Sequence, residues 1–307
     1  FAEDPLRIRS LYNDEGCLNA KIVDARRELS EDGSGLVVTY VVEEGPQFVF
    51  DGYTIDFGED APELSEDTVR DELDMQPGDV FSATEYRDDV LAVDALYRNQ
   101  GYMLVEIRDD LDTNTAAETV GATLTIHEGN TITVGEIQLE GLTKTKEHIV
   151  MRELERMGIE PGEPMQAGDL DKARQNIIQL GSFIQDVRFT PRGTDDDKRK
   201  DLLVELRENV RTGLFTIGGG YGSESGVFGV AEIGDGNLMG RAYRVNVRAE
   251  LGQRARRVGQ VSFATPWIFG TPTSLRAQLY SVNQRRFLYS YQGAVTAEKR
   301  RMPRKDK

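Results

Sequence analysis

Two patterns of hydrophobic residues divide this chain near residue 209. Before it, helical spacing alternates with short strand-like segments: Val69 and Leu73, for example, are four residues apart, as on one face of a helix. After it, helical spacing disappears, and segments of about ten residues with apolar side chains at every second position alternate with turn-forming residues. The pattern therefore predicts a first part that mixes helices and strands and a second part built of strands alone.

The first part repeats itself. Residues 96–107 resemble residues 11–22 at a shift of 85, with Leu, Tyr, Gly and Ile coinciding. Residues 77–79 (Pro-Gly-Asp) recur as residues 161–163 (Pro-Gly-Glu) at a shift of 84. We therefore expect three copies of one unit of roughly 80 residues, of which the first lacks its beginning.

The order of patterns within a complete copy predicts a β-α-α-β-β unit. In the central copy, Ser82 precedes a Glu by three residues, which is the capping-box arrangement at a helix start. Gly101 then supplies the left-handed residue that favours a helix end. The strands of this copy are expected at residues 49–57, 103–109 and 120–128.

The second part has the alternation of a membrane barrel. Residues 243–251 place Tyr, Val, Val, Ala and Leu on one face and Arg, Asn, Arg and Glu on the other, which suits lipid on one side and a wet lumen on the other. Six strands are too few for a closed barrel, which needs about eight, so we expect the barrel to be cut short. The expected strands are 213–222, 226–233, 241–252, 258–265, 272–282 and 287–297.

Charge follows the same division. The net charge is -16, but residues 209–307 carry +10 and the residues before them carry -26. An acidic first part repels phosphate, which argues against nucleic acid as a partner.

Few residues are suited to catalysis or to metal binding. One cysteine (Cys17) and two histidines exclude a disulfide framework and leave almost nothing for a zinc site or a His-based triad. The glycines at 218–222 lack the Lys of a phosphate loop, and Asp195 to Asp197 lack the ligand spacing of a calcium loop, so a hairpin turn is expected there. We predict no enzymatic activity and no cofactor.

Several short motifs, in order, resemble those of one family. The repeats carry Leu96-Tyr97, Gly101-Tyr102 and Glu128-Gly129, and the second part carries YGSESGV at 221–227, GNLMG at 236–240 and Thr265-Pro266-Trp267. With residues 141–154 (GLTKTKEHIVMREL), they resemble the BamA-type outer-membrane assembly factors. Those proteins consist of polypeptide-transport-associated (POTRA) repeats and a barrel. Two departures are Cys17, where the signature has an aromatic, and Ser182, where it has Gly.

The resemblance implies α+β POTRA repeats followed by an all-β antiparallel transmembrane barrel, truncated after about six strands. The expected domains are the C-terminal part of a repeat (1–46), a complete repeat (47–129), the barrel-proximal repeat (130–209) and the first barrel strands (210–307). It places the repeats in the periplasm and the barrel in the bacterial outer membrane. The implied activity is folding and insertion of outer-membrane proteins. Implied partners are unfolded outer-membrane proteins, accessory assembly lipoproteins, and outer-membrane lipid and lipopolysaccharide.

Two alternatives stay open. A two-partner-secretion or translocation-type transporter would export one dedicated substrate, but such exporters typically carry two POTRA repeats, and parts of three are present here. A soluble periplasmic scaffold is disfavoured by the apolar stripe of the second part.

Strand edges are the expected binding sites, because unfolded outer-membrane chains are strands without partners. In each repeat the strand after the second helix is the expected edge. The residues concerned are Met103, Val105, Ile107, Val187 and Phe189. In the barrel, a glycine-rich first strand predicts a weak lateral seam, since glycine weakens a strand; the alternative is that these glycines only relieve crowding where the barrel bends. The seam residues are Gly213, Gly218, Gly219, Gly220, Tyr221 and Gly222.

Two further sets concern the membrane. Trp267 and Phe269 are expected in the aromatic girdle beside a periplasmic turn. Arginines in the expected outer loops either bind lipopolysaccharide phosphates, which they match with paired donors, or are solvated loop charges. They are Arg254, Arg256, Arg257, Arg285 and Arg286.

Overall fold

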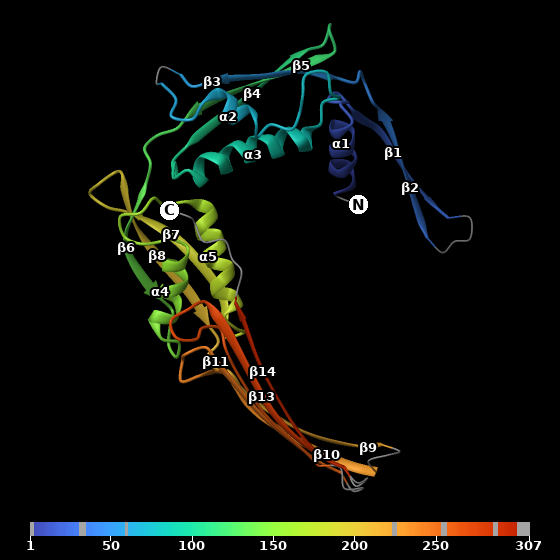
Figure 1. The fold of residues 1–307 in the computed structure, drawn as a ribbon. Helices are drawn as coiled ribbons and strands as arrows, with labels where there is room; N and C mark the ends of the chain where they lie inside the picture. Colours follow the sequence, from blue (N-terminus) through green and yellow to red (C-terminus); the bar gives the residue numbers. More distant parts are fainter. Residues whose placement is uncertain are drawn as a thin grey trace. The chain divides into compact units, whose positions relative to one another are not determined.

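The computed structural model describes residues 3–30, 35–58, 61–222, 226–252, 257–284 and 288–299 (Figure 1). The chain forms two compact units, Phe1–Thr131 and Ile132–Lys307. Among the described residues, no helix is both long and apolar enough to cross a membrane.

The first unit contains the end of one repeat and a complete second repeat. The end of the first repeat comprises α1 (Asp4–Asp14) and the antiparallel pair β1 (Lys21–Leu29) and β2 (Leu36–Glu43). The complete repeat comprises β3 (Val49–Asp56), α2 (Glu66–Arg70), α3 (Ala83–Asn99), β4 (Glu106–Asn114) and β5 (Thr119–His127). Its sheet has the order β3-β5-β4, with β3 parallel and β4 antiparallel to β5.

The core of the complete repeat lies between this sheet and its helices. Val69 of α2, Val93 and Tyr97 of α3 and Leu124 of β5 are fully buried. The predicted helix signals are confirmed: the Ser82 hydroxyl accepts from the backbone N–H of Glu85 at 3.2 Å, and Gly101 has φ +99°.

The second unit begins with the barrel-proximal repeat. Its elements are β6 (Thr133–Glu140), α4 (Glu147–Arg156), α5 (Ala167–Gln179), β7 (Ile184–Gly193) and β8 (Arg199–Glu208), with sheet order β6-β8-β7. The three aspartates at 195–197 lie in the turn between β7 and β8, as predicted.

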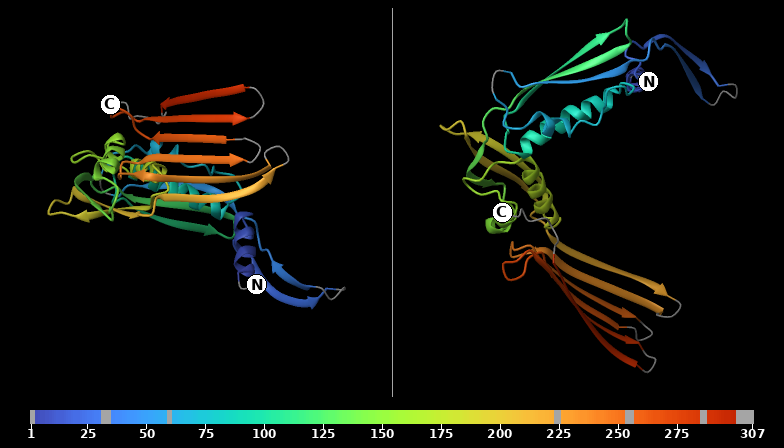
Figure 2. Two further views of the ribbon diagram at one scale, coloured as in Figure 1. Left: turned by 90° about the horizontal axis from the view of Figure 1, so that it is seen from below. Right: turned by 45° about the horizontal axis from the view of Figure 1, so that its top comes forward.

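A six-stranded antiparallel sheet follows, with each strand paired to the next in sequence (Figure 2). Its strands are β9 (Gly213–Gly222), β10 (Gly226–Leu238), β11 (Tyr243–Gly252), β12 (Arg257–Thr265), β13 (Thr273–Gln284) and β14 (Leu288–Lys299). The predicted fold class is therefore confirmed. Within this sheet the largest boundary difference is at β10, which continues to Leu238 and not to residue 233 as expected, because Asp235 pairs with Val245 and Leu238 with Tyr243.

The two faces of this sheet differ as the alternation predicts. Val247 pairs with Val261 on one face. On the other, Arg248 forms ion pairs with Glu232 at 3.9 Å and Glu250 at 3.8 Å, and the Asn246 amide donates to Glu232 at 2.6 Å. Charged side chains on this face therefore satisfy one another across neighbouring strands.

Candidate functional site

One edge of the complete repeat's sheet is covered by the chain itself. The backbone N–H of Phe50 in β3 donates to the carbonyl of Asp79 at 2.8 Å, and the carbonyl of Phe50 accepts from Gly78 at 2.8 Å. The carbonyl of Phe48 accepts from Phe81 at 3.0 Å. The Pro-Gly-Asp segment thus occupies the backbone groups at the start of this edge.

The barrel-proximal repeat covers the same edge in the same way. Val134 of β6 donates its N–H to Glu163 and accepts from Gly162, both at 2.8 Å. Met165 donates to the carbonyl of Ile132 at 2.7 Å. The recurrence of Pro-Gly with an acidic residue in the sequence therefore has a structural cause, since it closes the outer edge of each repeat's first strand.

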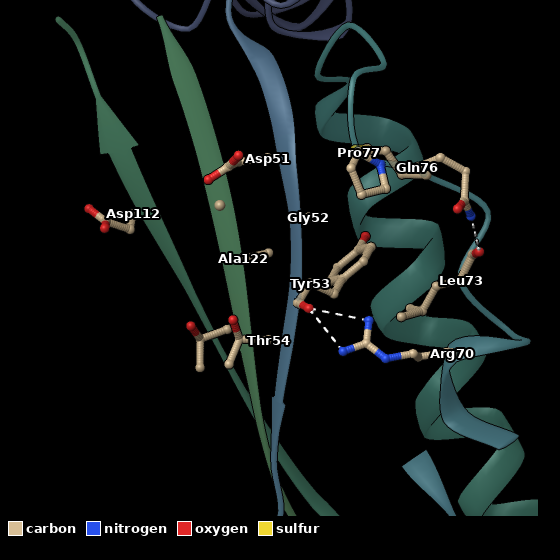
Figure 3. A pocket seen from close by; sticks show the side chains of 13 residues that line it. Asp51, Gly52, Tyr53, Thr54, Arg70, Leu73, Gln76, Pro77, Asp112 and Ala122 are labelled. Carbon is tan, nitrogen blue, oxygen red and sulfur yellow. Dashed lines mark hydrogen bonds between the residues drawn. The ribbon is translucent and has the colours of Figure 1, made fainter. Parts of the chain in front are cut away.

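Further along β3, the edge is covered by a side chain and not by backbone. Both terminal nitrogens of Arg70 donate to the carbonyl of Tyr53 at 3.3 Å, beside a cavity of about 410 Å³ (Figure 3). The register of β3 shifts between Phe50 and Gly52, and Gly52 has φ +127°, a conformation that favours glycine. This bulge and the arginine leave little regular edge for another strand to join.

The opposite edges are open. Within the described part of the chain, β4 pairs only with β5, and β7 pairs only with β8. Of the residues expected on these edges, Ile107, Val187 and Phe189 lie within the strands. Met103 lies in a turn before β4 and Val105 directly precedes it, because Arg98 holds the carbonyl of Met103 at 2.7 Å.

Another open edge belongs to β9. Within the described residues it pairs with β10 and with no other strand. Phe215, Ile217 and Tyr221 are exposed on one face, while Gly218 and Gly220 alternate with them on the other.

The glycines of β9 do not share one environment. A Cβ at Gly220 would lie 3.0 Å from Cζ of Phe228, and one at Gly219 would lie 2.9 Å from the Phe228 carbonyl oxygen. A Cβ at Gly218 would make an ordinary contact of 3.5 Å with Val230. Two of these glycines therefore make room for β10, whereas Gly218 does not need to be glycine for packing.

Where β9 begins, the sheet is docked on the barrel-proximal repeat. A Cβ at Gly240 would overlap the carbonyl oxygen of Lys144, and the Gly240 carbonyl accepts from the N–H of Lys146 at 2.9 Å. The amide of Asn237, which is fully buried, donates to the hydroxyl of Thr145 at 2.8 Å. The turn between β10 and β11 therefore lies directly on the loop before α4.

Glu208 at the end of β8 shapes that loop. Its carboxylate accepts from the backbone N–H of Thr143, Lys144 and Thr145 at 2.7, 2.9 and 2.9 Å. The hydroxyls of both threonines also donate to it. Partial burial acts to raise the pKa of Glu208, but these hydrogen bonds outweigh it and hold the pKa below its usual value.

A second polar cluster joins Lys144 to the start of β9. Its ammonium group donates to the Thr212 hydroxyl at 2.6 Å and to Asp235 at 3.0 Å. The Thr212 hydroxyl also donates to the Asp235 carboxylate. Lys144 and Asp235 are about three-quarters buried, so their attraction is less screened than that of a surface pair.

Trp267, predicted to lie in the aromatic girdle, is bound to helix α4 of the barrel-proximal repeat. Its indole N–H donates to Glu153 at 2.5 Å, and the guanidinium of Arg152 lies 4.7 Å from the centre of its ring. Glu153, which is fully buried, is also 3.2 Å from Arg156. The indole thus supplies a donor to a buried carboxylate on α4, and the girdle position of Trp267 stays a prediction. Phe269 is 95% exposed.

Most of the arginines predicted to bind lipopolysaccharide lie outside the part of the chain that the structure describes. Arg254, Arg256, Arg285 and Arg286 lie outside the described residues. Arg257 begins β12, and its side chain also lies outside what the structure describes.

Sequence reasoning missed the junction between repeat and sheet. A signal was present: Glu208 stands 80 residues after Glu128, and each is the last charged residue of its repeat. In the complete repeat, Glu128 likewise holds the loop before the first helix, accepting from the N–H of Glu63 at 2.9 Å and of Leu64 at 3.3 Å.

Comparison with known proteins agrees with this architecture. Residues 55–129 and 132–209 each match the POTRA family (surface antigen variable number repeat), and residues 237–300 match the Omp85 superfamily domain. The chain is 26% identical over 283 residues to the outer membrane protein assembly factor BamA of Neisseria meningitidis, covering 91% of this chain and 34% of that protein. It is 23% identical over 299 residues to a putative outer membrane protein assembly factor of Treponema pallidum, covering 93% and 34%. The chain thus spans about a third of the length of these relatives.

Solved structures show the same fold. BamA from Haemophilus ducreyi lacking POTRA domains 1–3 superposes with a TM-score of 0.63 at 18% identity, covering 82% of this chain and 46% of that one. Haemophilus influenzae BamA POTRA3–5 gives 0.52 at 19% identity, covering 68% and 80%. Two POTRA matches followed by an Omp85 superfamily match, together with these BamA relatives, support the identification of the chain as a fragment with the architecture of a BamA-type assembly factor.

Proposed function

We propose that this protein assembles β-barrel proteins in the bacterial outer membrane, with its repeats in the periplasm. Its relatives from Neisseria and Treponema are named as assembly factors of this kind. Because the chain covers about a third of each, the activity is inferred from the geometry of its strand edges as well as from these names.

The observation that carries the proposal is the difference between the two edges of each repeat. The first strand's edge is covered by the Pro-Gly segment, while the edges of β4 and β7 have no second strand neighbour in the described part of the chain. An unfolded outer-membrane chain would join the open edges by β-augmentation, in which its backbone pairs with the free N–H and C=O groups. Carboxylates of β4, at Glu106, Asp110 and Asp112, keep that edge from pairing with a second copy of itself.

The edge of β9 would receive the substrate next. An incoming strand could pair with β9 in place of the strand that closes the barrel, and the glycines would make that exchange easier by loosening register. Insertion would then proceed without covalent chemistry, since each step exchanges one set of strand pairs for another.

Site-specific photo-crosslinking tests the edge mechanism. A photoreactive residue in place of Asp110 on β4 or Arg188 on β7 should capture unfolded outer-membrane protein in intact cells. The matched controls are Val80 and Pro164, which pair with the covered edges of β3 and β6. Equal capture at open and covered edges would refute the proposal.

Other partners follow from the resemblance and from charge. We also propose that accessory assembly lipoproteins bind the repeats, that Phe269 contacts membrane lipid, and that the outer-loop arginines bind lipopolysaccharide phosphates. Replacing Arg254 and Arg256 with Gln should then weaken binding of lipopolysaccharide vesicles. Unchanged binding would rule out those two contacts.

A further inference from the structure

We propose that Lys144 is a positioning residue that keeps the start of β9 paired with β10, so that β9 becomes free to move at the seam first at its glycine-rich end. This inference rests on the proposed seam at β9. It adds a direction of opening and assigns the control of that direction to the barrel-proximal repeat.

The start of β9 is tied down from two sides. Thr212, the residue before β9, is linked to Asp235 both directly through its hydroxyl and through the ammonium group of Lys144. Its carbonyl also accepts from the N–H of Gly236 at 2.9 Å. Since Gly213 pairs with Asp235, this cluster holds the first rung of the β9–β10 ladder.

The other end of β9 has no comparable tie among the described residues. Between Gly213 and Tyr221 the strand extends by roughly 25 Å, at about 3.3 Å per residue. Residues 214–217 carry side chains, and three consecutive glycines follow. Loss of pairing is therefore easiest at Gly218 to Gly222 and hardest at Gly213.

Lys144 can hold this rung because its own backbone is fixed. Its N–H donates to Glu208 at 2.9 Å, and its carbonyl packs directly on Gly240. Glu208 in turn pairs with Ile184, the first residue of the open edge strand β7. The repeat that would bind a substrate strand on β7 therefore also holds the base of the seam, through one continuous set of contacts.

Hydrogen–deuterium exchange on the full-length protein in lipid nanodiscs tests the inference. Replacing Lys144 with Met removes the ammonium group but keeps a side chain of similar length. We expect amide exchange at residues 213–217 to become about tenfold faster, as for loss of a charge-assisted hydrogen bond, while exchange at 218–222 stays as fast as in the unmodified protein. Lys144→Arg should restore much of the protection.

Lys172→Met is the matched control, because Lys172 also forms an ion pair, with Asp169 at 3.6 Å, but on α5. It should leave exchange in β9 unchanged. Thr212→Val removes the hydroxyl at the same tie and gives an independent measurement if Lys144→Met does not fold. Unchanged exchange at 213–217, or an equal increase along the whole of β9, would overturn the proposal.

The assembly rate of outer-membrane proteins, measured on the same variants, separates this inference from the proposed function. Altered exchange at 213–217 with a normal assembly rate would support the tie and argue against the seam as the working site. Unaltered exchange would reject the tie whatever the rate.

Discussion

The hydroxyl of Tyr97 donates to the carboxylate of Glu128 at 2.9 Å, and this bond joins two of the motifs that mark the repeat. Tyr97 ends the Leu-Tyr pair on α3, and Glu128 begins the Glu-Gly pair after β5. The first repeat has the same contact between Tyr12 and Glu44 at 3.1 Å. Burial and the neighbouring carboxylate raise the pKa of Tyr97, so the phenol stays a donor at any physiological pH.

Tyr97→Phe should destabilise the complete repeat by about 1.5–3 kcal/mol, since it removes a hydrogen bond to a charged group and keeps the buried ring. Chemical denaturation would measure the loss. Tyr102→Phe is the control, because its ring packs edge-on against Tyr97 while its hydroxyl makes no hydrogen bond within the described residues. Equal losses in the two variants would show that ring polarity, not the bond to Glu128, matters.

In the barrel-proximal repeat the same glutamate position has new partners. Glu208 accepts hydrogen bonds from the hydroxyls of Thr143 and Thr145, on the loop against which the sheet packs. Ile177 lies in the last turn of α5, at the place where α3 has a tyrosine. In the complete repeat, Glu128 stabilises the repeat itself. At the equivalent position of the next repeat, Glu208 in addition connects that repeat to the barrel strands.

Stability of this junction should depend on pH through Glu208. Because its pKa is lowered in the folded state, the contribution is complete above the unfolded value of about 4.3 and is lost as pH falls through the lower folded value. Glu208→Gln should therefore be less stable than the unmodified protein at pH 7, and the gap should shrink below about pH 4. Denaturation curves from pH 7 to 3 would measure it. A difference in unfolding free energy that is independent of pH would mean that Glu208→Gln disturbs the packing of the loop and that the charge of Glu208 does not matter.

Trp267→Phe should destabilise the second unit by about 1.5–3 kcal/mol, because buried Glu153 loses its indole donor while it keeps its ion pair with Arg156. Phe269→Leu, two residues away on a side chain that is 95% exposed, should change the unfolding free energy little. Thermal unfolding compares the two. If Phe269→Leu has the larger effect, Trp267 is not the anchor of this turn.

The sequence alone predicted the elements better than their contacts. Period-two alternation identified all six sheet strands, because one face of each is apolar regardless of its neighbours. The start of β4 was placed too early, since the turn at Met103 depends on Arg98 reaching its carbonyl. The junction was missed because it joins residues such as Thr145 and Asn237, which are 92 positions apart and carry no pattern in common.

The glycine-rich strand gives the most direct test of the seam. Valine at Gly218 or at Gly220 would restrict the backbone of this strand, but the structure separates the two positions. At Gly220 a Cβ would lie 3.0 Å from the ring of Phe228, so valine there must displace the ring and would change packing as well as stiffness. At Gly218 the nearest atom is Cγ1 of Val230 at 3.5 Å, which is ordinary contact.

Gly218→Val should therefore slow the assembly of outer-membrane proteins while the barrel itself still folds, because valine favours an extended strand and restricts the backbone. Folding is checked by electrophoretic mobility without heating, and assembly by the rate at which a newly made outer-membrane protein reaches its folded form. Gly229→Val, on the paired strand opposite Gly219, serves as a control for added side-chain volume next to the seam. If folded Gly218→Val protein assembles its substrates at the normal rate, backbone freedom at Gly218 is not needed for assembly, and the seam does not open there.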